Sequence, residues 1–231
     1  MSTVEPLILA VETATLSGSV ALARGEHILA AFAGDSGVSH SNTLLNDIDK
    51  LLHEAQIDLA RIDLFAVANG PGSFTGLRIG IATIKGLAAT LGRPCAGIPT
   101  LQAVALAAGE AAHSVALLPA GRGEVFAQLF SVTKDGFVTS LDEATHISPQ
   151  ILIEKYGSLE NVLWCGAGAM ANKELIEREA RGRVAPLIPV LATHVAALAF
   201  ARFREQQLER PDELQAIYVR PSDAELKKVG S

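Results

Sequence analysis

Residues 69–80, NGPGSFTGLRIG, contain the residue types best suited to chemistry in this chain. Glycines stand at positions 70, 72, 76 and 80, after an apolar run typical of a buried strand and before one typical of a helix. Such a junction presents free backbone N–H groups that favour an anion. The spacing, however, fits neither G-x-G-x-x-G nor the P-loop, which requires Gly-Lys-Ser/Thr. A phosphate cradle that includes Gly70 and Gly72 is therefore one interpretation, and a plain strand-to-helix turn is the other.

The same segment also suggests a packing role. One stripe of the predicted helix is apolar, and beside it Gly76, Gly80 and Thr83 form a stripe of small residues. Because each interior glycine costs ~1 kcal/mol relative to alanine, a close contact should offset that cost. The close approach of another helix would provide it. The contact could be with the helix at residues 44–55 of this chain, with a second chain, or with both.

Two further turns are candidates for nucleotide chemistry. In residues 11–22, VETATLSGSVAL, the carboxylate of Glu12 and the hydroxyls of Thr13 and Thr15 suit a Mg-nucleotide held through water and phosphate. The alternative is a β-turn with local Ser/Thr hydrogen bonds. In residues 165–169, CGAGA, Gly166 and Gly168 form a turn that suits contact with an adenosine.

Other catalytic classes find little support. The GDSG tetrapeptide at residues 34–37 resembles the nucleophile of chymotrypsin-like proteases, but no aspartate lies upstream and only His27 precedes it among the histidines. The six histidines never form an H-x-x-x-H pair, so we expect no metalloenzyme. The two cysteines, Cys95 and Cys165, indicate neither a disulfide framework nor a zinc site.

Charge and hydropathy set limits on partners and location. The net charge of −6 is unlike that of a protein that binds nucleic acid alone, so a partner would have to supply the positive surface. No apolar run approaches the ~20 residues of a membrane span, and the amino terminus does not resemble a secretory signal. We therefore expect a cytoplasmic protein that does not contact membranes.

The hydrophobic pattern predicts an α/β fold of two lobes, residues 1–110 and 111–231, that repeat the order βββαβα. The last helix is expected to pack back on the first lobe, and ligands are expected between the lobes at the carboxyl ends of strands. The expected strands are residues 7–11, 19–23, 28–32, 64–68, 94–98, 115–118, 125–132, 137–141 and 162–165, with a short one at 216–220. The expected helices are residues 44–55, 74–91, 149–155, 170–181 and 195–209.

Six motifs, taken in order, resemble the TsaB family, which takes part in making threonylcarbamoyladenosine (t6A) in bacterial tRNA. They are VETATLSGSVAL, SHSNTLLNDIDKLL, NGPGSFTGLRIGIATIKGLA, GIPTLQAVA, GRGEVF and AIYVR. The resemblance implies an actin-like (ASKHA, ribonuclease H-like) fold, in agreement with the repeated lobes. It also implies a non-catalytic role.

The resemblance further implies a set of partners. In the family, TsaB pairs with its catalytic paralogue TsaD, and the same surface allows a TsaB homodimer. The ATPase TsaE docks on the complex, and tRNA is met only through that complex, which modifies the adenosine beside the anticodon. No cofactor is implied for this chain itself, although ATP or ADP in the complex stays open.

Carried over by position, the resemblance assigns two helices to the partner surface. Its residues are His40, Leu44, Asp47, Ile48, Leu51, Phe74, Thr75, Gly76, Arg78, Ile79 and Gly80. The chain departs from the family at Glu12, where aspartate is usual, at Ala14, where glycine is usual, and at residues 119–121 and Phe126. The rival hypothesis is an actin-like enzyme that hydrolyses ATP at the turn containing Thr13.

Overall fold

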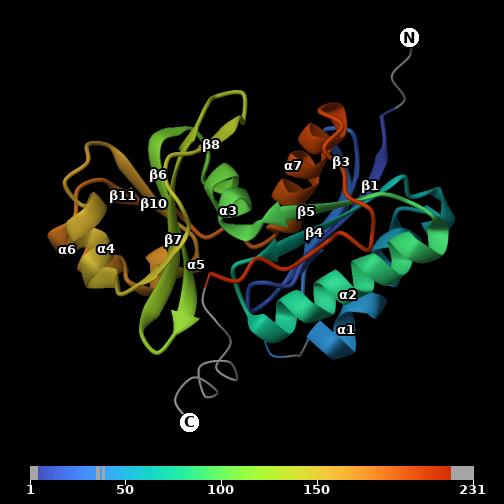
Figure 1. Ribbon diagram of the computed structural model, residues 1–231, viewed down its shortest axis with the longest axis horizontal. Helices are drawn as coiled ribbons and strands as arrows, with labels where there is room; N and C mark the ends of the chain where they lie inside the picture. The colour runs from blue at the N-terminus through green and yellow to red at the C-terminus, as the bar shows by residue number, and fades with distance from the viewer. Residues whose placement is uncertain (1–4, 35–36, 38–39, 220–231) are drawn as a thin grey trace. The chain divides into compact units, whose positions relative to one another are not determined.

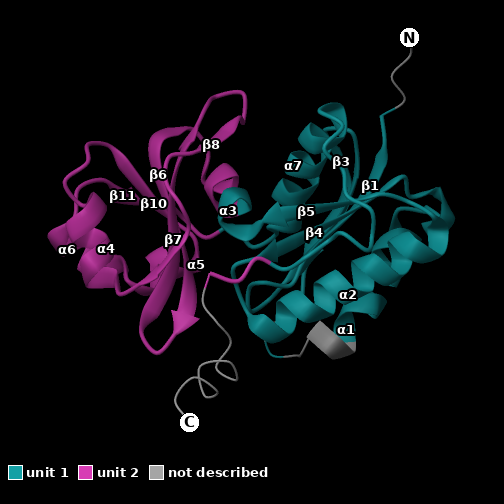
Figure 2. Cartoon of the chain, in the orientation of Figure 1, with its two compact units in different colours: residues 1–103, 188–216 teal, residues 104–187, 217–231 magenta. Residues whose placement is uncertain are grey.

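The computed structural model describes residues 5–34, 37 and 40–219, although not the side chains of residues 40–42. Two compact units share the chain, as Figure 2 shows. Unit 1 contains residues 1–103 and 188–216, and unit 2 contains residues 104–187 and 217–231. Each unit is built around its own β-sheet.

Unit 1 contains a five-stranded sheet in the order β3-β2-β1-β4-β5. Strands β1, β2 and β3 are antiparallel neighbours, whereas β4 and β5 run parallel to β1. Its elements are β1 (Leu7–Glu12), β2 (Ser19–Arg24), β3 (His27–Ala33), α1 (His40–Glu54), the 3-10 turn η1 (Leu59–Arg61), β4 (Leu64–Gly70), α2 (Phe74–Leu91), β5 (Cys95–Pro99), the first turn of α3 (Thr100–Ala108) and α7 (Ala192–Arg204).

Helices cover both faces of this sheet (Figure 1), with α7 on one face and α1 and α2 on the other. Strands β1 and β4 are buried along their whole length, which explains why they read as continuous apolar runs and not as alternating ones. Helix α2 begins where the Ser73 hydroxyl accepts the Gly76 N–H. It ends at Gly92, whose φ of 62° suits glycine.

Unit 2 contains a second sheet in the order β11-β10-β6-β7-β8, and β9 also pairs with β7. Strand β10 runs parallel to β6 and β11, while β7 is antiparallel to β6 and β8. Its elements are the rest of α3, β6 (Ala111–Gly121), β7 (Glu124–Val132), β8 (Val138–Ser140), β9 (Thr145–Ile147), α4 (Pro149–Tyr156), β10 (Val162–Cys165), α5 (Ala167–Ala171), α6 (Lys173–Glu179) and β11 (Arg183–Val184).

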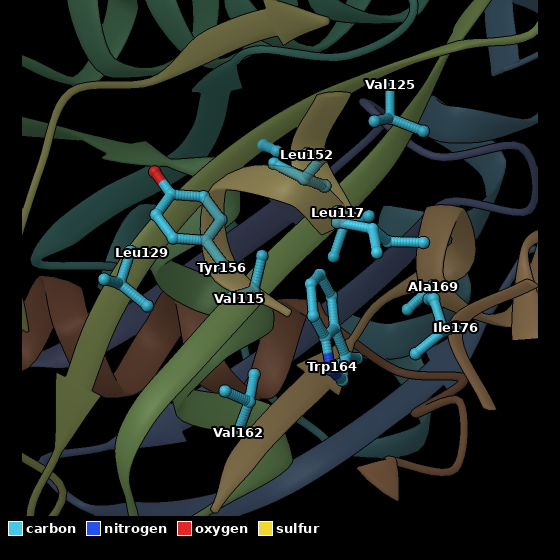
Figure 3. Close-up of a cluster of buried hydrophobic side chains, with 12 residues drawn as sticks. Val115, Leu117, Val125, Leu129, Leu152, Tyr156, Val162, Trp164, Ala169 and Ile176 are labelled. Atoms are coloured by element: carbon cyan, nitrogen blue, oxygen red, sulfur yellow. The ribbon is translucent and has the colours of Figure 1, made fainter. Parts of the chain in front are cut away.

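The core of unit 2 lies between its sheet and helices α4, α5 and α6, and Figure 3 shows its side chains. Trp164, on β10, is fully buried at its centre. The indole N–H of Trp164 donates to the carbonyl of Arg181 at 2.9 Å, so its one polar group is satisfied. Val115 and Leu117 of β6 supply the facing apolar surface.

The two sheets repeat one topology. Reading β8-β7-β6-β10-β11 against β3-β2-β1-β4-β5 gives the same strand order and the same parallel and antiparallel neighbours. In unit 1 α1 follows the third strand β3, and in unit 2 α4 follows the third strand β8 after the short extra strand β9. The next α-helix, α2 or α5, follows the parallel strand beside the first, β4 or β10. The predicted βββαβα repeat is therefore confirmed.

Some predicted elements were wrong. The helix expected at residues 170–181 is two helices, because the Asn172 side chain donates to the carbonyl of Gly168 and its backbone leaves the helical region. Helix α7 begins and ends earlier than residues 195–209, since Ala192 N–H donates to the buried Ser19 hydroxyl and Gln206 adopts a φ of 57°. Residues 216–219 form no strand, and residue 220 lies outside the described residues.

Helix α3 and strands β9 and β11 were not predicted. None of the helices in the described part of the chain is long and apolar enough to cross a membrane.

Candidate functional site

The turn after β1 is closed by its own carboxylate. Glu12 is only 1% exposed, and its Oε1 and Oε2 accept the backbone N–H and the hydroxyl of Thr15, each at 2.7 Å. A bound phosphate would require donors of this kind at a turn between two strands. In this structure Glu12 already uses them.

The same turn is fastened to the start of α2. The Thr13 hydroxyl donates to the carbonyl of Gly76 at 2.8 Å, in a buried position. The Ser73 N–H donates to the carbonyl of Ala14, also at 2.8 Å. The β1–β2 turn and the first turn of α2 therefore form one rigid junction, which we call the hairpin–helix junction.

Three glycines allow the β1–β2 turn to lie this close to the start of α2. A Cβ at Gly72 would lie 2.6 Å from the Ala14 Cβ, one at Gly76 would overlap the backbone oxygen of Thr13, and one at Gly80 would overlap the Thr13 hydroxyl. The space beside Gly76 and Gly80 is thus filled by the same chain and not by a helix of a second chain. Because both glycines are buried, any surface that α2 offers to a partner must be made by other residues.

The remaining candidate glycines also pack against their own units. Gly70 has a φ of 122°, and its N–H donates to the Thr100 hydroxyl at 3.1 Å. Gly166 precedes the short helix α5 with a φ of 91°, and a Cβ there would overlap the carbonyl of Leu117. A Cβ at Gly168 would lie 2.9 Å from Leu117. At these positions a positive φ or a close neighbour within the same unit accounts for the glycine.

The predicted partner residues of α1 do not all lie at the surface. Leu44, Ile48 and Leu51 are buried in unit 1, with exposed fractions of 5%, 4% and 0%. Asp47 is half-buried, and Leu45, which the sequence reasoning did not select, is 64% exposed. His40 begins the helix, but its side chain lies outside the described residues.

Helix α2 presents a distinct outward face. Phe74, Thr75 and Arg78 are exposed, Ile79 is half-buried, and the Arg78 guanidinium lies 3.9 Å from the centre of the Phe74 ring. The face continues through Ala82 to Gly86, where an added Cβ would meet nothing within 4 Å. We call Leu45, Phe74, Thr75, Arg78, Ile79, Ala82 and Gly86 the outer helix face.

The sequence held a signal for Ala82 and Gly86, the two members of this face on α2 that were not predicted. They continue the helical spacing of the predicted Thr75 and Ile79, on the side away from Leu77, Ile81, Ile84 and Ala88, which are all buried.

The cysteines are poor nucleophiles in this setting. Burial raises the pKa of the Cys165 thiol to about 12. Burial, together with the charge of Glu209, raises the pKa of the Cys95 thiol to about 11. Across residues 5–34 and 40–219, no three His, Cys, Asp or Glu side chains gather in a way that could hold a metal.

Comparison with solved structures defines the class of fold. The chain aligns with YeaZ from Pseudomonas aeruginosa at a TM-score of 0.79 and 25% identity, over 92% of this chain and 99% of that one. It also aligns with the ROK hexokinase of Thermus thermophilus at a TM-score of 0.51 and 14% identity, over 86% of this chain and 99% of that one, which bears on the fold alone. Two units of one topology and these neighbours define an actin-like fold.

Comparison of sequences defines the family. The tRNA threonylcarbamoyladenosine biosynthesis protein TsaB of Escherichia coli K12 is 32% identical over 155 residues, which are 66% of this chain and 67% of that protein. Residues 35–148 also match the model of the family TsaD: tRNA N6-adenosine threonylcarbamoyltransferase. The chain belongs to the TsaB family.

Proposed function

We propose that this chain is a non-catalytic scaffold subunit in the formation of t6A beside the anticodon of tRNA. In this proposal it pairs with the catalytic protein TsaD through the outer helix face. The pair then recruits the ATPase TsaE. The relatives named for t6A biosynthesis support the pathway, and the exposed surface of α1 and α2 supports the role within it.

The observation that carries the proposal is the exposed apolar surface of α1 and α2. Leu45 is 64% exposed and Phe74 is 38% exposed, on helices whose other faces are packed in the core. Exposed apolar side chains mark protein–protein interaction sites where they gather in a patch, and aromatic and arginine side chains such as Phe74 and Arg78 are enriched in interfaces. The open space at Gly86 would allow a partner helix to approach the backbone of α2 closely.

The kind of partner is suggested by the family match. Residues 35–148 resemble TsaD, and that span contains both α1 and α2. A protein with corresponding helices would offer a similar face, so the two could pair about a pseudo-twofold axis. Two copies of this chain could pair in the same way, which makes a homodimer the competitor of the TsaD complex.

Two features favour a scaffold over an ATP-hydrolysing enzyme. The donors of Thr15 are engaged by Glu12, so a nucleotide phosphate would have to displace a buried carboxylate. The net charge of −6 also disfavours direct binding of tRNA, which we assign to the complex as a whole. Steady-state ATP turnover by the chain alone, lost in Thr13→Ala, would contradict this part of the proposal.

The test is light-scattering mass after size exclusion, for the chain alone and mixed with TsaD of the same organism. Ala82→Arg places a large cation on the outer helix face, whereas Ala197→Arg makes the same change at an exposed position of α7. We expect a one-to-one complex with wild type and with Ala197→Arg, and none with Ala82→Arg. Complex formation by all three proteins would place the interface elsewhere.

A second assay tests whether t6A formation requires this chain as a scaffold. In a reconstituted reaction with the threonylcarbamoyl-adenylate synthase, TsaD, TsaE and tRNA, t6A is quantified by mass spectrometry of nucleosides. We expect t6A to require this chain and to be lost with Ala82→Arg but not with Ala197→Arg. Full t6A formation without the chain would contradict a scaffold role.

A further inference from the structure

Unit 1 contains a pocket at the end of its sheet opposite the hairpin–helix junction. Its walls are Glu5, just before β1, Glu26 in the β2–β3 turn, and the last turn of α7 with the residues that follow it. Its volume of about 780 Å³ lies within the roughly 300–1,000 Å³ of small-molecule sites. Because it lies at the amino-terminal end of β1, it is separated by the length of that strand from Glu12 and the hairpin–helix junction.

The inner wall of the pocket is aromatic. Phe200 and Phe203 lie one helical turn apart on α7, with ring centres 6.4 Å apart and planes inclined by 15°. Both side chains are only half-buried, although the rest of that face of α7 is packed against the sheet. Two partly exposed parallel rings suit a flat or aliphatic group and can attract a cation to their faces.

The rim of the pocket is acidic on balance. Glu5 and Glu26 contribute two carboxylates, and Arg204 is the one guanidinium among the lining residues. Arg204 Nη1 lies 3.9 Å from Glu26 Oε1, and both side chains are about 70% exposed, so their ion pair is weak. The carboxylate of Glu5 lies against Gly25, where an added Cβ would be 2.8 Å from Oε2. The carboxyl end of α7 adds partial negative charge at the same place.

We propose that this pocket binds a small organic cation, an alkylammonium or guanidinium group on an apolar stem. The stem lies against Phe200 and Phe203, and the cationic group donates hydrogen bonds to Glu5 and Glu26. Gln206, which also lines the pocket, supplies an amide that donates to or accepts from the same ligand. Two sources share this chemistry: a free polyamine, or a lysine or arginine side chain of another protein.

The test uses isothermal titration calorimetry and saturation-transfer NMR with four small probes. They are butylguanidinium, butylammonium, butanol and butyrate, which differ in charge at a constant stem. We expect the two cations to bind one to one and the anion not to bind. Removing both carboxylates with Glu5→Gln and Glu26→Gln should weaken cation binding about tenfold. The matched control is Glu154→Gln, an exposed carboxylate on α4, which should leave binding unchanged.

Three results would overturn the proposal: no binding of either cation, equal binding of butanol and butylammonium, or equal loss in the Glu154→Gln control. Phe203→Leu provides a second variant that keeps every charge and should also weaken the cations. Spermidine and acetyl-Gly-Arg-Gly-amide then separate the sources, since tighter binding of the first supports a polyamine and of the second a protein side chain. Neither result depends on TsaD, so failure here leaves the proposed function untouched.

Discussion

Substituting the glycines of α2 one at a time tests the hairpin–helix junction. Gly80→Ala would place a Cβ on the Thr13 hydroxyl and 3.3 Å from a methyl of Val67. The hydroxyl can move only by breaking its buried hydrogen bond to the carbonyl of Gly76. Overpacking costs about 1–3 kcal/mol and the lost bond about 1 kcal/mol. Against this stands a gain of about 1 kcal/mol from replacing a helical glycine. We expect a net loss of about 1–3 kcal/mol.

Two further glycine substitutions in α2 serve as references for Gly80→Ala. Gly86→Ala meets nothing within 4 Å, so it should stabilise the protein by about 1 kcal/mol through helix propensity alone. Gly76→Ala overlaps a backbone oxygen, which no rotamer can remove, so it should cost more than Gly80→Ala. The order of stability is therefore expected to be Gly86→Ala, wild type, Gly80→Ala, Gly76→Ala.

A double-mutant cycle with Thr13→Ala isolates the contact between residue 80 and the Thr13 hydroxyl. In that background the atom that blocks residue 80 is gone and the Thr13 Cβ lies at 3.5 Å, an ordinary contact, so Gly80→Ala should become close to neutral. Gly76→Ala should stay harmful. Urea unfolding followed by circular dichroism gives the free energies, and hydrogen exchange of α2 peptides locates the change. Stabilisation by Gly80→Ala equal to that by Gly86→Ala would refute the reasoning.

Three other substitutions test separate features. Gln56→Gly should raise stability by about 1 kcal/mol in urea unfolding, because Gln56 closes α1 with a φ of 53°, and no change would mean that this conformation is unstrained. Leu214→Ala should cost about 3 kcal/mol, because Leu214 is 1% exposed and packs on Gly97 of β5; a loss below 1 kcal/mol would mean that the carboxyl-terminal segment is dispensable. His194→Leu should reduce acid sensitivity. Burial lowers the pKa of His194, so its neutral form gives stability that is present above about pH 6.5, the ordinary pKa of histidine, and is lost as pH falls through the lower folded value. Equal pH profiles of unfolding for wild type and His194→Leu would contradict that assignment.

Much of the fold could be predicted because its strands carry strong local signals. β1 and β4 are continuous apolar runs, and the Asp135-Gly136 pair marked the β7–β8 hairpin, where Gly136 has a φ of 77°. The errors in the predicted elements also had local causes. The nine residues of α3 lack a charged face, so their helical period was not recognised, and Asn172 interrupts a segment that reads as one helix.

The candidate site was less predictable, for a physical reason. Sorting α2 by face placed Gly76 and Gly80 on one stripe, but sequence spacing does not reveal which neighbour fills the space beside them. That neighbour, Thr13, lies 63 residues earlier in the chain than Gly76. In the same way, Leu44 and Leu45 are adjacent in sequence, yet only one of them is buried. A contact between distant segments becomes visible only when the sheet brings them together.

The two units, which share one topology, differ at the position where a partner surface would be expected. In unit 1 the segment after β4 is the single 18-residue helix α2, fastened to the β1–β2 turn by Thr13 and Ser73. In unit 2 the segment after β10 is divided into α5 and α6, of five and seven residues. A long helix whose register is fixed at its first turn holds an outer face of constant geometry, whereas two short helices joined at Asn172 present no continuous face. The repeat therefore favours unit 1 as the place where the proposed TsaD partner would bind.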